Sequence, residues 1–335
     1  MEGRLDKLRR AWSGWPGRIF RLLFAFVPIY WIVRRVDLRA TLREAMTIGW
    51  PTLAAALGVS MAGIVAGAIR WRVLIRAYGA ERLPAVLTLL RHCFVAFYYN
   101  VLPTGLAGDV LRGYRVRAFL DIPRSYTVIV VERLAGLTGL LLLAAGAMLF
   151  GPLLGASLVI RALDVGIAVA VCCAVAFVAL PYAASRAASW RSTLARAPLI
   201  GGLLLKVPPA RRPSGVLTAI VLSLLTQGSA VLFTYLIAHR LSPDTTLLQV
   251  ARVVPYVILL AWIPITPLGV GQRDFLVVYF FGRVGLHPET ALALSLVQFG
   301  LGVVVIVAGG IWHLCERLLG LVGEEDTVSP TQKEP

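Results

Sequence analysis

The chain has 335 residues, of which 58% are hydrophobic and only 15% charged, whereas about 25% of residues are charged in an average soluble domain. Its formal net charge is +16, and 30 of its 33 basic residues are Arg. These residues gather in loops beside apolar runs, where they set topology and meet anionic lipid headgroups. We therefore exclude a sizeable soluble domain and nucleic-acid binding, and expect an all-α membrane helix bundle.

Six apolar runs are candidates for helices that cross the membrane, which takes roughly 20 residues for about 30 Å of hydrocarbon. The first run is short, but no small-residue cleavage site follows it, so we interpret it as a span and not as a secretory signal. We expect one transmembrane domain over residues 1–319 and a disordered polar tail over 320–335. The predicted spans are Phe20–Val33, Trp50–Ile69, Leu134–Ile160, Val165–Ser185, Pro213–Ala238 and Thr290–Trp312.

Two further apolar stretches, residues 84–119 and 247–281, are interrupted by Pro and Gly near their middles. We interpret them as re-entrant hairpins that enter from opposite faces, as in an inverted repeat. The loops then predicted to be cytoplasmic hold 22 Lys and Arg, and the outside loops hold nine. If the first stretch crossed the membrane, ten of the inside residues would change sides, so the positive-inside rule favours the hairpins. The result is six spans in the cell membrane, with both termini cytoplasmic.

The two interrupted stretches carry similar motifs, LPTGLAGDVLR over Leu102–Arg112 and TPLGVGQRDF over Thr266–Phe275. Each has a proline, two glycines within five residues, and then an Asp and an Arg. Matched breaks in two halves of a transporter point to a binding site at the interface of the halves. Unwound backbone survives in lipid only where it lines a polar cavity or is covered by protein. We therefore expect the two tips to approach each other near mid-membrane.

These motifs have the chemistry to hold an anionic headgroup. Glycines let bare N–H groups approach a ligand, a following helix N-terminus favours an anion such as phosphate, and arginines add forked donors. Glu132 and Arg133, just before a long apolar run, should face the bundle interior or the interface, and we include them. The candidate headgroup-binding residues are Asn100, Pro103, Gly105, Gly108, Asp109, Arg112, Glu132, Arg133, Pro267, Gly269, Gly271, Arg273 and Asp274.

Plainer interpretations of the same residues stay open. Each motif can be a proline kink or an interfacial turn, and Asp109 with Arg112, at i,i+3, can be a local ion pair. The triplet Arg70-Trp71-Arg72 ends the second span and is typical of an aromatic anchor whose arginines reach the headgroups. The four Cys and four His are scattered without metal-ligand spacing, so we expect no metal site and no other cofactor.

Five segments occur in the order RWR (Arg70–Arg72), FYYNVLPTGLAGDVLRGYR (Phe97–Arg115), VERLAGL (Val131–Leu137), PITPLGVGQRDF (Pro264–Phe275) and GLHPETALALSLV (Gly285–Val297). Together they resemble the lysylphosphatidylglycerol synthase transmembrane-region family, also called flippase-like membrane proteins, over about residues 20–319. The resemblance implies a polytopic bundle that moves a lipid or a lipid-linked headgroup between leaflets. It also places Asp109, Arg112, Arg133, Arg273 and Asp274 at the family's motif positions.

The chain departs from the family pattern in three ways. The second motif usually ends in Glu where this chain has Asp274, and Ala107 replaces a common Gly. Aminoacylating relatives carry a large soluble synthase domain after the spans, and this sequence has only a short tail there. The resemblance therefore implies that synthesis of a lysyl-lipid is not its activity, and the lipid need not be lysylphosphatidylglycerol.

We expect a lipid flippase or transporter, and not an enzyme. The sequence has no GxxxxGK[ST] phosphate loop, so we expect movement to be downhill, driven by the membrane potential, or coupled to protons. The alternatives are a non-catalytic partner of a lipid-pathway enzyme, or a membrane transferase acting on a lipid phosphate, which would need paired carboxylates or a His beside its site. Besides membrane lipids, the expected partners are an enzyme of lipid biosynthesis and a second copy of the chain.

Overall fold

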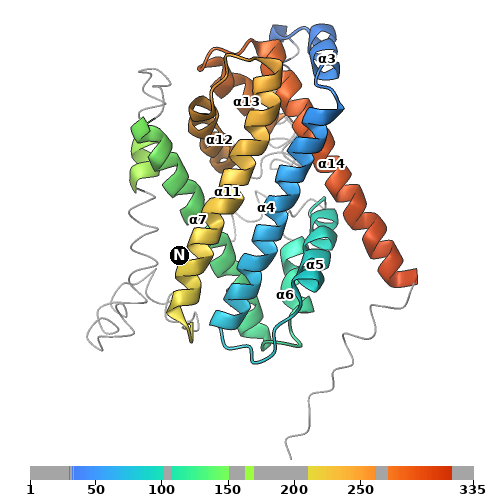
Figure 1. Ribbon diagram of the computed structural model, residues 1–335, viewed down its shortest axis with the longest axis vertical. Helices are drawn as coiled ribbons and strands as arrows, with labels where there is room; N and C mark the ends of the chain where they lie inside the picture. The colour runs from blue at the N-terminus through green and yellow to red at the C-terminus, as the bar shows by residue number, and fades with distance from the viewer. Residues whose placement is uncertain are drawn as a thin grey trace, which may run out of the picture. The chain divides into compact units, whose positions relative to one another are not determined.

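The computed structural model describes Tyr30, Ile32 and residues 34–101, 107–150, 163–169, 210–261 and 271–318 (Figure 1). The regular structure within these ranges is helical and includes no strand, which confirms the predicted all-α membrane bundle. Most of the first and fourth predicted spans, residues 102–106 and 262–270 in the middles of the interrupted stretches, and the predicted polar tail lie outside the described residues.

Four helices are long and apolar enough to cross a membrane, and they confirm four of the six predicted spans. The shortest of these spans has 28 residues, and a rise of about 1.5 Å per residue makes it longer than the roughly 30 Å of hydrocarbon. Exposed apolar side chains such as Val65, Leu225 and Val307 suit a lipid environment. The four helices are α4 (Trp50–Ala77), α7 (Ile122–Phe150), α11 (Pro213–Leu241) and α14 (Pro288–Leu318).

Helix α7 corrects one predicted boundary, because it begins at Ile122 and not at Leu134. Asp121 starts the helix: its Oδ1 accepts a hydrogen bond from the Arg124 N–H at 3.0 Å, and Pro123 occupies the first turn, where it is tolerated. Glu132 therefore lies inside the helix and not ahead of it. A charge that is paired within the protein does not have to end a span.

The first interrupted stretch forms two short antiparallel helices, α5 (Val86–Tyr99) and α6 (Ala107–Arg115). Arg115 at the end of α6 contacts His92 in the middle of α5. Gly108 at the start of α6 donates its N–H to Asn100 at the end of α5. Helices of 14 and nine residues are too short to cross the hydrocarbon. The predicted helical hairpin is confirmed, and the side from which it enters stays a prediction.

The second interrupted stretch has the same plan, with α12 (Leu247–Ala261) and α13 (Gln272–Gly282). Gln272 Nε2 donates to the Leu260 carbonyl at 2.9 Å, and the rings of Tyr256 and Phe280 stack with centroids 5.4 Å apart. The first contact joins the end of α12 to the start of α13, and the second joins the middle of α12 to the end of α13, so the two helices are antiparallel.

The chain divides into two compact units, with boundaries that fall within α4, α11 and α14 and before the last residue of α7. One unit contains α12, α13 and α3 (Leu38–Met46), and it comprises Met1–Leu57, Phe150–Ser157 and Val231–Leu301. The other contains α5, α6 and most of α7, and it comprises Gly58–Leu149, Leu158–Ala230 and Gly302–Pro335.

The core of the second unit forms around the end of α4. Trp71 and Leu74 of α4 are fully buried, and they cluster with Leu89 of α5 and Val128 of α7. Helices α7 and α11 also approach closely, since a Cβ on Gly139 would lie only 2.7 Å from the Ser223 Cβ. A larger residue at position 139 would therefore push α11 away from α7.

Candidate functional site

Helix α6 begins at Ala107, within the first interrupted stretch. The Gly108 N–H donates to Asn100 Oδ1 at 3.1 Å, and a Cβ on Gly108 would collide with the Ala96 carbonyl and the Asn100 side chain. Glycine is required here because α5 and α6 approach so closely. Two predicted site residues, Asn100 and Gly108, thus close the hairpin and aim the first turn of α6.

Asp109 in that first turn binds an arginine of α7 more closely than it binds its neighbour on α6. Arg133 donates from Nε to Asp109 Oδ2 at 2.9 Å, and its Nη2 donates to the same oxygen. Arg112 Nη1 lies 3.7 Å from the other oxygen, Oδ1. The i,i+3 ion pair predicted as an alternative therefore exists, but it is the longer of the two contacts, and Asp109 mainly ties α6 to α7.

Arg112 binds Glu132, one residue before Arg133 in the sequence. Its Nη2 donates to Glu132 Oε2 at 2.6 Å, and its guanidinium carbon lies 4.1 Å from the centroid of the Trp71 ring, within the range of a cation–π contact. Its Nε is buried and has no hydrogen-bond partner among the described residues. Glu132 then reaches a third arginine, because its Oε1 accepts from Arg70 Nη2 at 3.0 Å.

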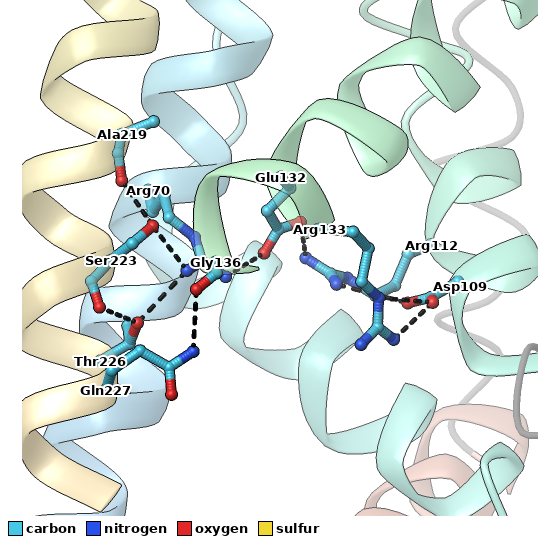
Figure 2. A network of polar contacts seen from close by, with 10 residues as sticks. All are labelled: Arg70, Asp109, Arg112, Glu132, Arg133, Gly136, Ala219, Ser223, Thr226 and Gln227. Atoms are coloured by element: carbon cyan, nitrogen blue, oxygen red, sulfur yellow. Dashed lines mark hydrogen bonds and ion pairs between the residues drawn. The ribbon is translucent and has the colours of Figure 1, made fainter. Parts of the chain in front are cut away.

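Arg70 links this ion cluster to α11. Its Nη1 donates to Ser223 Oγ at 3.0 Å and to Thr226 Oγ1 at 3.2 Å, and Gln227 Nε2 nearby donates to the Gly136 carbonyl at 3.2 Å. Figure 2 shows these polar side chains of α11 beside Arg70 and the charged residues of α6 and α7. We call the five charged residues the buried charge network: Arg70, Asp109, Arg112, Glu132 and Arg133.

The interpretation of Arg70-Trp71-Arg72 as a headgroup anchor is wrong. The Arg70 side chain is only 12% exposed, Trp71 is fully buried, and Arg72 Nε donates to the Pro84 carbonyl at 2.9 Å. The sequence held one signal for this role of Arg70. Ser223, Thr226 and Gln227 share one face of a largely apolar helix at i,i+3,i+4 spacing, and such polar stripes in a span usually face a polar partner.

The network carries an excess of positive charge inside apolar helices. It holds three guanidinium groups and two carboxylates, and all of them except Arg133 are at most 12% exposed at the side chain. The Arg133 side chain is 47% exposed. Buried charges are tolerated when they are paired and hydrogen-bonded, so the ion pairs explain how α4, α6 and α7 accommodate them. Arg133 is the member through which the network meets its surroundings.

The second motif is held by α14 within the other unit. Asp274 Oδ2 accepts the Gly271 N–H at 2.9 Å, and its Oδ1 accepts the Ser295 hydroxyl. Arg273 Nη2 donates to the Ser295 carbonyl at 3.2 Å and lies 3.6 Å from Asp274 Oδ1. Gly271 has φ +77°, which favours glycine at this turn. Ser295 was not among the predicted residues, although it lies in the fifth segment of the family pattern.

The predicted site residues thus fall into three groups. Asp109, Arg112, Glu132 and Arg133 come together in one network, with Asn100 and Gly108 beside them in the hairpin. Gly271, Arg273 and Asp274 form a second cluster in the other unit, so a site shared by the two motifs stays a prediction. Pro103, Gly105, Pro267 and Gly269 lie outside the described residues.

Comparison with known proteins agrees with the sequence resemblance. A search of curated proteins gives no match. A family model described as the lysylphosphatidylglycerol synthase TM region matches residues 18–310. The matched region takes in the whole buried charge network and both helical hairpins. The chain therefore belongs to the lysylphosphatidylglycerol synthase transmembrane-region family.

Proposed function

We propose that the chain is a transporter that moves an anionic lipid headgroup between leaflets, with the buried charge network as its binding site. The surplus of arginine supports this most: three guanidinium groups share two carboxylates within apolar helices. Two ion pairs would satisfy a purely structural role. A charged arginine at mid-membrane costs at least about 2.5 kcal/mol. Because two carboxylates cannot neutralise three guanidinium groups, a bound anion would offset the remaining positive charge.

Arg133 is the residue best placed to make the first contact with a headgroup. Its side chain is 47% exposed, and its Nε and Nη2 share one oxygen of Asp109. Its Nη1 has no hydrogen-bond partner in the part of the chain that the structure describes. A guanidinium binds phosphate through two parallel N–H groups, so a phosphate at Arg133 would replace a crowded single-oxygen contact with a bidentate one.

The remaining contacts of Asp109 make this exchange reversible. When a phosphate binds Arg133, the Asp109 carboxylate retains its ion pair with Arg112, whose Nη1 already lies 3.7 Å from Oδ1. No carboxylate is left alone in a medium of low dielectric, where loss of its partner is strongly destabilising. Arg112 in turn stays anchored by Glu132 at 2.6 Å. The network can therefore bind an anion and release it without the loss of its own ion pairs.

The proposal places the protein in the cell membrane with both termini cytoplasmic, in line with the distribution of basic residues. The membrane potential then favours outward movement of an anionic headgroup by about 2.3 kcal/mol per charge per 100 mV. The lipid is a phospholipid or a lipid-linked phosphate. Transport of this kind breaks no covalent bond, so the proposal involves no enzymatic step.

Reconstituted vesicles test the proposal. Fluorescent phosphatidylglycerol in phosphatidylcholine vesicles, bleached from outside with dithionite, reports movement between leaflets. We expect Arg133→Gln and Asp109→Asn to reduce that movement at least about tenfold, because each loses a charge-assisted contact. Arg124→Gln and Asp121→Asn are matched controls, since this pair lies at the exposed start of α7 and asparagine still caps a helix.

Two outcomes would contradict the proposal. The first is wild-type protein that moves the lipid no faster than empty vesicles do. The second is an Asp109→Asn protein that fails to accumulate while the fraction recovered transports normally, since the network would then serve folding alone.

A further inference from the structure

Helix α6 carries a third charged residue, Arg115, that does not join the buried charge network. Its Nη2 donates to Glu316 Oε2 of α14 at 3.2 Å, and its Nη1 lies 2.9 Å from His92 Nδ1. An arginine cannot accept a hydrogen bond, so His92 accepts at Nδ1. Arg115 is thereby fixed between α5 and α14, three residues beyond Arg112.

Glu316 also contacts a second arginine from a different helix. Arg91 Nε of α5 lies 3.6 Å from Glu316 Oε1, and the same oxygen accepts the Trp312 indole N–H at 3.1 Å. The guanidinium of Arg91 lies over the Trp312 ring, 5.7 Å from its centroid. A single carboxylate, with its side chain 6% exposed, thus lies between two guanidinium groups that approach its two oxygens. We call Arg91, Arg115, Trp312 and Glu316 the Glu316 cluster.

The Glu316 cluster has donors to spare. Its two arginines face one carboxylate, that of Glu316. Neither Nη1 nor Nη2 of Arg91 has a hydrogen-bond partner among the described residues, and the Arg91 side chain is 25% exposed. Two arginines that converge on one pair of oxygens make the arrangement that also binds a phosphate group.

We propose that the Glu316 cluster is a second anion site, which binds the phosphate of a lipid headgroup at Arg91 and Arg115, and that the Glu316 carboxylate occupies this position when no phosphate is bound. The proposal rests on the proposed transport function and adds a position to its path. Arg115, Arg112 and Asp109 follow one another at three-residue steps of about 4.5 Å along α6. A headgroup at Arg115 is therefore one step from the buried charge network.

Arg91 and Arg115 lie within the region that matches the family, whereas the α14 part of the cluster lies beyond it. The family match ends at residue 310, and Trp312, His313 and Glu316 follow it in the last turns of α14. By the charge distribution, this end of α14 faces the cytoplasm. The Glu316 cluster would thus receive a headgroup from the cytoplasmic leaflet before it reaches the network.

The competing explanation is a purely structural role, in which Glu316 only holds α14 against α5 and α6. The two explanations predict opposite effects of Glu316→Gln. If the carboxylate competes with phosphate, its neutralisation leaves two free arginines and tightens phosphate binding. If its role is purely structural, the same change loosens the packing of α14, and phosphate binding becomes weaker or stays unchanged.

Cys315, an exposed thiol beside Glu316, offers a local reporter. An environment-sensitive fluorophore is attached there in the full chain, with Cys172 and Cys173 replaced by Ser and Cys93 left buried. The purified protein in neutral detergent is titrated with dihexanoyl phosphatidylglycerol, with dihexanoylglycerol as the uncharged comparison, and with inorganic phosphate. Glu81→Gln, an exposed glutamate in the loop before α5, is the matched control.

We expect a saturable response to the phospholipid and none to dihexanoylglycerol. Glu316→Gln should tighten binding by about tenfold, and Arg91→Gln and Arg115→Gln should weaken it by at least as much, as for a charge-assisted hydrogen bond. Arg91→Gln is the charge variant least able to disturb the fold, because its ion pair is long and its side chain is more exposed than those of Arg115 and Glu316. An equal response to inorganic phosphate supports the anion site and identifies free phosphate as sufficient.

The proposal is overturned if neither phosphate compound changes the signal, or if Glu316→Gln lowers the melting temperature without tighter binding. Failure of transport is a separate result. Arg112→Gln should retain the response at Cys315 even where it abolishes lipid movement. Binding at the Glu316 cluster and lipid movement are therefore measured separately, and either one can fail while the other is retained.

Discussion

Arg112 of α6 and Glu132 of α7 are joined by a 2.6 Å contact that fastens the short hairpin helix to a membrane-spanning helix. The other oxygen of Glu132 holds Arg70 of α4 at 3.0 Å. One carboxylate thus connects three helices, and two arginines depend on it for their main ionic partner. The consequences can be measured at each of these positions.

Neutralisation of Glu132 should be the most destabilising single change in the network. Glu132→Gln leaves Arg70 and Arg112 buried without a carboxylate between them, and loss of one partner of a buried pair costs about 3 to 5 kcal/mol. We expect a large fall in the melting temperature of the detergent-solubilised protein, with Glu81→Gln, in the exposed loop before α5, as the control. Adding Arg70→Gln should restore part of the loss, and no recovery would argue against the pairing.

Arg70→Lys tests whether the shape of the guanidinium matters as well as its charge. Arg70 donates to Glu132 on α7 and to Ser223 and Thr226 on α11 at once, whereas a lysine offers one compact charge that cannot fork between them. We expect a loss of about 1.5 to 3 kcal/mol, as for hydrogen bonds to a charged group. Arg76→Lys, exposed at the end of α4, should change the melting temperature little. Equal effects at the two positions would contradict the fork.

Gly108→Ala should separate α6 from α5. The added methyl group would collide with the Ala96 carbonyl and the Asn100 side chain, and overpacking of this kind costs about 1 to 3 kcal/mol. Lower thermal stability and slower lipid movement should appear together, because α6 carries Asp109 and Arg112. Gly67→Ala is the matched control, since its Cβ would meet nothing within 4 Å. If Gly108→Ala changed neither the thermal stability nor the rate of lipid movement, α5 and α6 would not pack as closely as the contacts of Gly108 indicate.

The hairpin topology predicts which side of the membrane Arg117 faces. In a chain whose cysteines are replaced by Ser, Arg117→Cys should react with an impermeant thiol reagent only after the cells are permeabilised, because the first hairpin returns to the cytoplasmic side. Arg240→Cys at the exposed end of α11 should react with the same reagent in intact cells, and it serves as the control that the reagent reaches the outside loops. Ready labelling of position 117 in intact cells would exclude the six-span topology.

Hydropathy predicted four helices and both hairpins because apolar length and Pro/Gly breaks are local properties of the sequence. It misplaced the start of α7, since Glu132 and Arg133 lower the local hydropathy although their partners allow them to lie within the helix. The partners of Arg70 were missed because a hydrophobic run does not fix the rotation of α11 about its axis, which decides where Ser223 points. The motif at Asp109 and Arg112 was identified, but the choice of Arg133 and Glu132 as partners depends on the packing of α6 against α7.

The contact between Arg112 and Trp71 has an optical consequence. The indole of Trp71 is fully buried, and the guanidinium of Arg112 lies 4.1 Å from its ring centroid. Emission from an indole depends on the charge beside it, so a chain that retains Trp71 as its single tryptophan would change colour or brightness whenever Arg112 moves. The protein thereby contains an intrinsic fluorescent reporter for the state of α6, at the residue that joins the hairpin to the network.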